Sequence, residues 1–197
     1  MRHPAPRLLF LLGGLLAAGC QPQPPLNTAH LPRGAFATGW FSGFIGAIDQ
    51  QGEALNVVQY DFADPARTYG NPAEGARAVA LLDYLAGEMP TNPQFFNVAP
   101  ATLQEMLQAR AAVRQAVGIK PDAPSQTVVD TLLAVFNALR ADDEVAARAA
   151  LTAPIYELPP DQTLQRLANL PYIRIANLAT TDAQQERFGP ANIGVRP

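Results

Sequence analysis

Residues 125–139, SQTVVDTLLAVFNAL, decide how this chain folds. The stretch follows Pro124 and carries apolar side chains at helical spacing, and these cover more than one face of a helix: Val128, Val129, Leu132, Leu133, Val135, Phe136 and Leu139. A helix that is apolar on several faces has to be surrounded by other elements. We therefore expect 125–139 to form the central, most buried helix of a bundle.

The neighbouring sequence predicts further helices with recognisable starts and ends. Residues 71–74, NPAE, place Asn at the N-cap, Pro at the first helical position and Glu at the third, ahead of ARAVALLDYLAGEM at 76–89. Another helix is expected from Pro100 to Gly118. The acids at 142–144 suit a helix N-terminus, and residues 159–170 predict a shorter helix.

Three segments leave alternatives open. LNVVQYDF at 55–62 alternates apolar and polar residues, so strand and helix are both possible, whereas 172–178 is typical of an extended segment that could pair with it. The uncharged stretch 35–48, AFATGWFSGFIGAI, predicts a buried first helix; the alternative is an interfacial segment that rests Trp40 and Phe44 among lipid headgroups.

The predicted fold is mainly α. We expect an irregular bundle of about five to six helices, with one short strand pair, 55–62 with 172–178, within a single domain at 34–188. A loose tail at 189–197 follows the domain.

The N-terminus carries the one motif with a clear meaning. Arg2 and Arg7 precede an apolar run at 8–16, and Ala-Ala-Gly at 17–19 leads into Cys20, the single cysteine of the chain. This pattern resembles a bacterial lipoprotein signal peptide, which implies cleavage after residue 19 and lipidation of Cys20. The alternative is a plain secretory signal that leaves a free thiol.

The resemblance implies a location. The apolar run is shorter than the ~20 residues of a membrane-spanning helix, so lipid chains on Cys20 would be the membrane anchor. Residues 20–33, rich in Pro and Gln, are expected to form a tether. The protein would face the periplasm from the cell envelope, and Gln21, in place of Asp, favours the outer membrane.

The charge of the chain excludes one class of partner. The 197 residues include 14 basic and 17 acidic ones, a net charge of −3. Removal of residues 1–19 takes Arg2 and Arg7 and no acid, which leaves 12 basic against 17 acidic residues and a net charge of −5. This balance argues against binding to nucleic acid.

Missing residue types exclude several chemistries. The two histidines are His3, in the signal, and His30, in the tether. The part after residue 30 therefore has no imidazole base and no thiol, which removes Ser-His-Asp and Cys-His catalysis and zinc sites built on His or Cys. We expect His30 to be a solvated linker residue and not a metal ligand.

Carboxylate chemistry remains open, because glycoside hydrolysis needs only two suitably placed acids. The candidates are Asp61, Asp64, Asp83, Glu88 and Glu105. Each is expected to be a cap, a salt-bridge partner or a surface residue. Glu105, beside an apolar seam, is the best candidate for a general acid, and the spacing of Asp61 and Asp64 does not fit a calcium loop.

Two arginines one helical turn apart, Arg110 and Arg114, have two possible roles. They could clamp a carboxylate of a peptide or a cell-wall stem. The alternative is that they pair with Asp83, Glu88 or Glu105 on neighbouring helices, or point into water.

These observations favour a lipid-anchored envelope protein, a non-catalytic helical scaffold or adaptor that binds another envelope protein. The alternatives are a carboxylate-based enzyme acting on glycans and a carrier of a small apolar ligand. We predict no catalytic residue, cofactor or metal site, so Cys20 is the only site residue.

Overall fold

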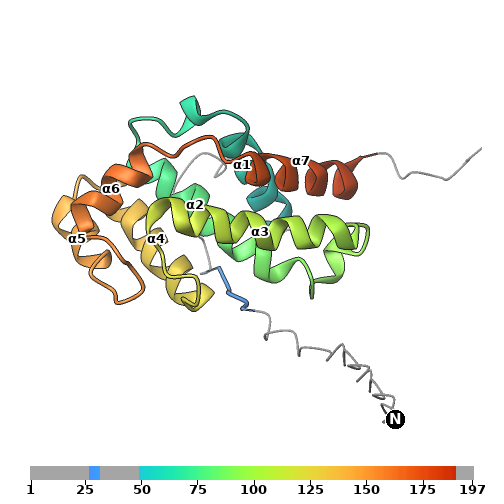
Figure 1. Ribbon diagram of the computed structural model, residues 1–197, viewed down its shortest axis with the longest axis horizontal. Helices are drawn as coiled ribbons and strands as arrows, with labels where there is room; N and C mark the ends of the chain where they lie inside the picture. Colours follow the sequence, from blue (N-terminus) through green and yellow to red (C-terminus); the bar gives the residue numbers. More distant parts are fainter. Residues whose placement is uncertain (1–26, 32–48, 190–197) are drawn as a thin grey trace, which may run out of the picture.

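The mainly helical fold is confirmed in a computed structural model, which describes residues 27–31 and 49–189. Within these residues there are seven α-helices and two short 3-10 helices, and no strand (Figure 1). Their bounds are α1 Gln50–Ala63, η1 Pro65–Arg67, α2 Pro72–Glu88, η2 Pro93–Phe95, α3 Pro100–Val117, α4 Ser125–Arg140, α5 Glu144–Ala150, α6 Pro160–Ala168 and α7 Arg174–Phe188. The predicted signal, Cys20, the element at 35–48 and the tail from 190 lie outside the described residues.

The predicted strand pair is wrong, because both segments are largely helical. Residues 55–62 lie inside α1, and α7 begins at Arg174. Tyr60, which a strand would place on the same face as Val58 and Phe62, is 46% exposed, while those two residues are buried. The buried residues Val58 and Phe62 are four positions apart, which is the spacing of side chains on one face of a helix. The two segments still belong to neighbouring elements, because α1 packs against α7.

Most of the predicted helix boundaries are confirmed by their hydrogen bonds. The Asn71 side chain accepts from Glu74 N at 3.2 Å at the start of α2, and Asp143 accepts from Ala146 N at 2.9 Å at the start of α5. Gly118 ends α3 with φ of 78°, a left-handed conformation that glycine adopts without steric cost.

The centre of the bundle is α2, not α4 as the sequence predicted. α2 packs against α1, α3, α4 and α6, and every residue from Ala78 to Gly87 is buried. α4 packs broadly on α2 but keeps Asp130 and Asn137 exposed. α2 is central because its small side chains let neighbouring helices approach closely. A Cβ added at Gly75 would lie 2.1 Å from the carbonyl oxygen of Leu167, so α6 packs directly against the α2 backbone.

Candidate functional site

The interior of the bundle contains an ion pair between α2 and α3. Arg114 on α3 and Asp83 on α2 are 2% and 1% exposed. Arg114 Nε donates to Asp83 Oδ2 at 2.6 Å and Nη2 donates to Asp83 Oδ1 at 2.9 Å, a bidentate arrangement. Desolvation makes such a pair stabilising only where the remaining donors are also satisfied.

The other donors of Arg114 are all used. Nη1 donates to the carbonyl oxygens of Pro121 and Ala123 at 3.0 and 2.9 Å, and Nη2 also donates to Ser125 Oγ at 3.0 Å. All five N–H groups of the guanidinium are therefore bonded within the protein. The salt-bridge alternative is confirmed for Arg114, which has no donor left to clamp a ligand carboxylate.

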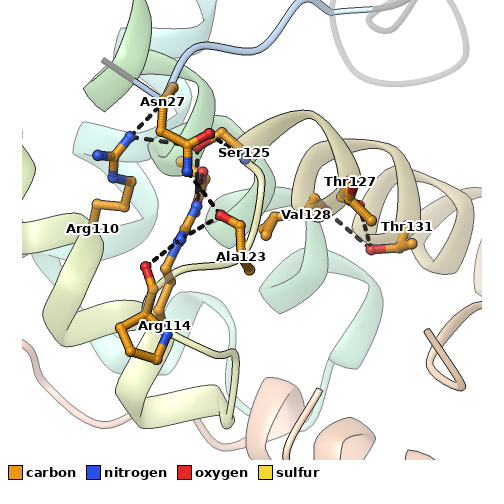
Figure 2. A network of polar contacts seen from close by, with 10 residues as sticks. Asn27, Arg110, Arg114, Ala123, Ser125, Thr127, Val128 and Thr131 are labelled. Carbon is orange, nitrogen blue, oxygen red and sulfur yellow. Dashed lines mark hydrogen bonds and ion pairs between the residues drawn. The ribbon is translucent and has the colours of Figure 1, made fainter. Parts of the chain in front are cut away.

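Figure 2 shows that Asn27 joins this cluster from a distant part of the chain. Its side-chain amide donates to Ala123 O at 2.8 Å, and its side-chain oxygen accepts from Ser125 N at 2.8 Å. Arg110 Nη1 donates to the Asn27 carbonyl oxygen at 3.0 Å. Burial lowers the pKa of Arg110, with Arg114 acting in the same direction and Asp83 opposing them. Arg110 thus holds a backbone carbonyl of the protein's own N-terminal segment.

The segment Asn27–Leu31, called here the docked segment, is packed onto the bundle. Gln126 forms two hydrogen bonds with the backbone of His30, accepting from its N at 2.7 Å and donating to its O at 3.0 Å. Ala29 is 1% exposed and belongs to the hydrophobic core. A Cβ at Gly87 would lie 2.5 Å from Asn27 O, so the missing side chain makes room for the segment. Within the predicted tether at 20–33, these five residues are therefore part of the domain.

A second buried acid lies between α1 and α2. Asp61 is 5% exposed, and its Oδ2 lies 3.5 Å from Nη2 of the half-buried Arg77. Arg77 pairs more closely with Glu74, at 2.5 Å. Among the described residues, neither Asp61 Oδ2 nor Arg77 Nε has a hydrogen-bond partner. Burial raises the pKa of Asp61 to about 6, with Arg77 opposing the rise and Glu74 adding to it.

The other acidic candidates, Asp64, Glu88 and Glu105, have different surroundings. Asp64 caps η1 by accepting from Ala66 N at 2.9 Å, and Glu88 accepts from Asn92 Nδ2 at 3.0 Å. Glu105 is half-buried on α3. No group of three or more His, Cys, Asp or Glu side chains suited to a metal ion occurs in the described part of the chain.

The structural role of Glu186 was not predicted from the sequence. Glu186 on α7 accepts from Ala99 N at 2.8 Å and from Thr102 Oγ1 at 3.0 Å, and so caps the N-terminus of α3. Ala99, the N-cap residue of α3, has no side-chain acceptor of its own. The absence of a capping side chain before Pro100 could have indicated that another residue caps α3. The sequence could not show that α7 supplies this carboxylate.

Comparison with protein-family models, with curated proteins and with solved structures found no match to this chain. In residues 27–31 and 49–189, no helix combines the length and the apolar character needed to cross a bilayer.

Proposed function

We propose that this protein is a lipid-anchored protein of the bacterial cell envelope, whose helical domain serves as a non-catalytic adaptor for another envelope protein. The anchor rests on the resemblance of residues 1–20 to a lipoprotein signal, with Cys20 as the lipidated residue.

One observation supports an adaptor over a ligand-binding role: the buried polar cluster around Arg114 is fully hydrogen-bonded within the fold. Arg114 spends its five donors on Asp83, Ser125 and two loop carbonyls. A binding site for an acidic ligand would need such donors to be free and accessible. The cluster instead joins three helices and the docked segment, which is a structural task.

The anchor is tested by metabolic labelling with palmitate in a bacterial host, with Cys20→Ser as the matched control. We expect label on the wild-type chain, none on the variant, and a mature N-terminus at residue 20. An unlabelled wild-type chain would contradict lipidation.

The adaptor role is tested by mild crosslinking of the anchored protein in isolated membranes. Crosslinked species that contain one other envelope protein, and that persist after purification, are expected. If the chain stays monomeric and is crosslinked to no other protein, the adaptor role is contradicted.

A specific observation favours one second candidate, the carboxylate-based enzyme acting on glycans. Asp61 is a buried acid whose pKa is raised to about 6, as a general acid requires, and a second acid, Glu74, pairs with the same Arg77 Nη2. Under this candidate, Asp61→Asn abolishes peptidoglycan turnover by the purified protein. Turnover that is absent in the wild type, or equal in the variant, removes it.

A further inference from the structure

We propose that the docked segment sets the orientation of the bundle, and that the face around Asn27–Leu31 is the one turned toward the bilayer that holds Cys20. This inference rests on the proposed lipid anchor. The occupant of the space in front of this face is the lipid surface itself.

The chain between the anchor and the docked segment is short. Six residues, 21–26, separate Cys20 from Asn27. Whatever their conformation, a chain of that length reaches at most about 25 Å. If the chain were attached to the domain only at Asp49, where the second described range begins, its maximum reach from Cys20 would be about 100 Å. Docking therefore reduces the maximum reach roughly fourfold.

The docked segment is held on the bundle by several hydrogen bonds. Asn27 is fixed by its side-chain amide, its side-chain oxygen and its backbone carbonyl, and His30 by both backbone groups. The buried Ala29 lies between them. One buried apolar side chain and five hydrogen bonds therefore hold the docked segment against α3, α4 and the loop between them.

The docked segment lies on one side of the domain. Figure 1 shows residues 27–31, in blue, along the lower side of the domain, while the connection from α1 to α2 lies on the upper side. The loop after α3, which contains the exposed Lys120 and Asp122, contacts the segment through Ala123. These two exposed charges are opposite in sign, so the loop itself offers anionic lipid no net attraction, and we assign the orientation to the short spacer.

Energy transfer on vesicles tests the orientation. The full chain, lipidated in its host, is reconstituted into phosphatidylcholine vesicles with an acceptor dye on a lipid headgroup. Because Cys20 is the only cysteine and is blocked by lipid, Asp122→Cys and Tyr69→Cys each give one labelling site. Tyr69 is 73% exposed, on the α1–α2 connection. We expect several-fold more energy transfer from position 122 than from position 69.

Release of the segment gives the decisive comparison. Gly87→Ala places a Cβ against Asn27 O, and Gln126→Ala removes both bonds to His30. With either variant, the difference between the two labels should shrink toward zero while circular dichroism shows an intact bundle. Gln104→Ala, at an exposed glutamine of α3, is the control and should preserve the difference.

The outcomes separate the two proposals. A chain that does not float with the vesicles contradicts the lipid anchor. A chain that floats but transfers energy equally from both positions overturns the orientation. A difference that persists in folded Gly87→Ala and Gln126→Ala proteins overturns the role of the docked segment.

Discussion

Two ion pairs, each with a buried acid, join α2 to its neighbours, and they are built differently. Asp83–Arg114, toward α3, is bidentate, and each N–H of its arginine has an acceptor. Asp61–Arg77, toward α1, is a single approach at 3.5 Å, with a carboxylate oxygen and an arginine Nε that have no hydrogen-bond partner among the described residues. The first pair also fixes a loop, whereas the second shares its arginine with Glu74.

The comparison shows that burial alone does not make an ion pair stabilising. Desolvation costs several kcal/mol for each charge, and full hydrogen bonding offsets that cost. Asp83–Arg114 meets this condition. Asp61–Arg77 does not, and the raised pKa of Asp61 reflects its unfavourable charged form.

The largest expected effect is at Arg114. Arg114→Met leaves Asp83 buried without its partner and removes one hydrogen bond from each of the carbonyls of Pro121 and Ala123, so the free energy of unfolding should fall by about 3–5 kcal/mol. Urea denaturation followed by circular dichroism measures the change. The matched variant Arg77→Met should cost clearly less, and equal losses at the two positions would break the comparison.

The next effect is a stabilisation at Asp61, with a defined pH dependence. Its pKa is about 6 in the folded protein against 3.8 ordinarily, so the native state binds more protons between these values. The stability from this group is present below pH 4 and lost as pH rises through 6, on the order of 3 kcal/mol. Asp61→Asn should lack this loss and be more stable than the wild type at pH 8.

Unfolding curves of both proteins at pH 4, 6 and 8 test this prediction. The difference in unfolding free energy between the two proteins should grow from pH 4 to pH 8. A constant difference would mean that Asp61 keeps its ordinary acidity in the folded protein.

The smallest effect is at an exposed ion pair, which extends the comparison to the surface. Arg148 bonds to Glu144 at 2.8 Å and to Asp161 at 2.7 Å, and so links α5 to α6. Because water and salt screen these charges, Arg148→Ala should change the melting temperature only slightly, and less at high salt. A loss comparable with that at Arg114 would show that geometry outweighs burial.

Much of the fold was predictable because local signals are strong in this chain. The cap at Asn71, the left-handed Gly118 and the acids before α5 marked helix ends correctly. The choice between strand and helix stayed open for 55–62 because a short apolar run fits either period, and packing against α2 and α7 decided for the helix. The central position of α2 was missed because its alanines and glycines looked weakly apolar, although their small size lets neighbours approach closely.

The candidate site was predictable only in part. The sequence suggested that Arg114 pairs with an acid such as Asp83, which the structure confirms. It gave no sign that Asn27 and Ser125 belong to the same cluster, since nearly a hundred residues separate them. The partner of Glu186 was hidden for the same reason.

By itself, the sequence determined that the chain forms helices, where most of them begin and end, and that no His or Cys follows residue 30. These properties depend on residue type and on neighbours within a few positions. Only the tertiary structure decided which helix lies at the centre, which arginine is satisfied, and that residues 27–31 belong to the domain. Those outcomes depend on the close approach of distant backbones and on complete hydrogen bonding after burial, which no local pattern records.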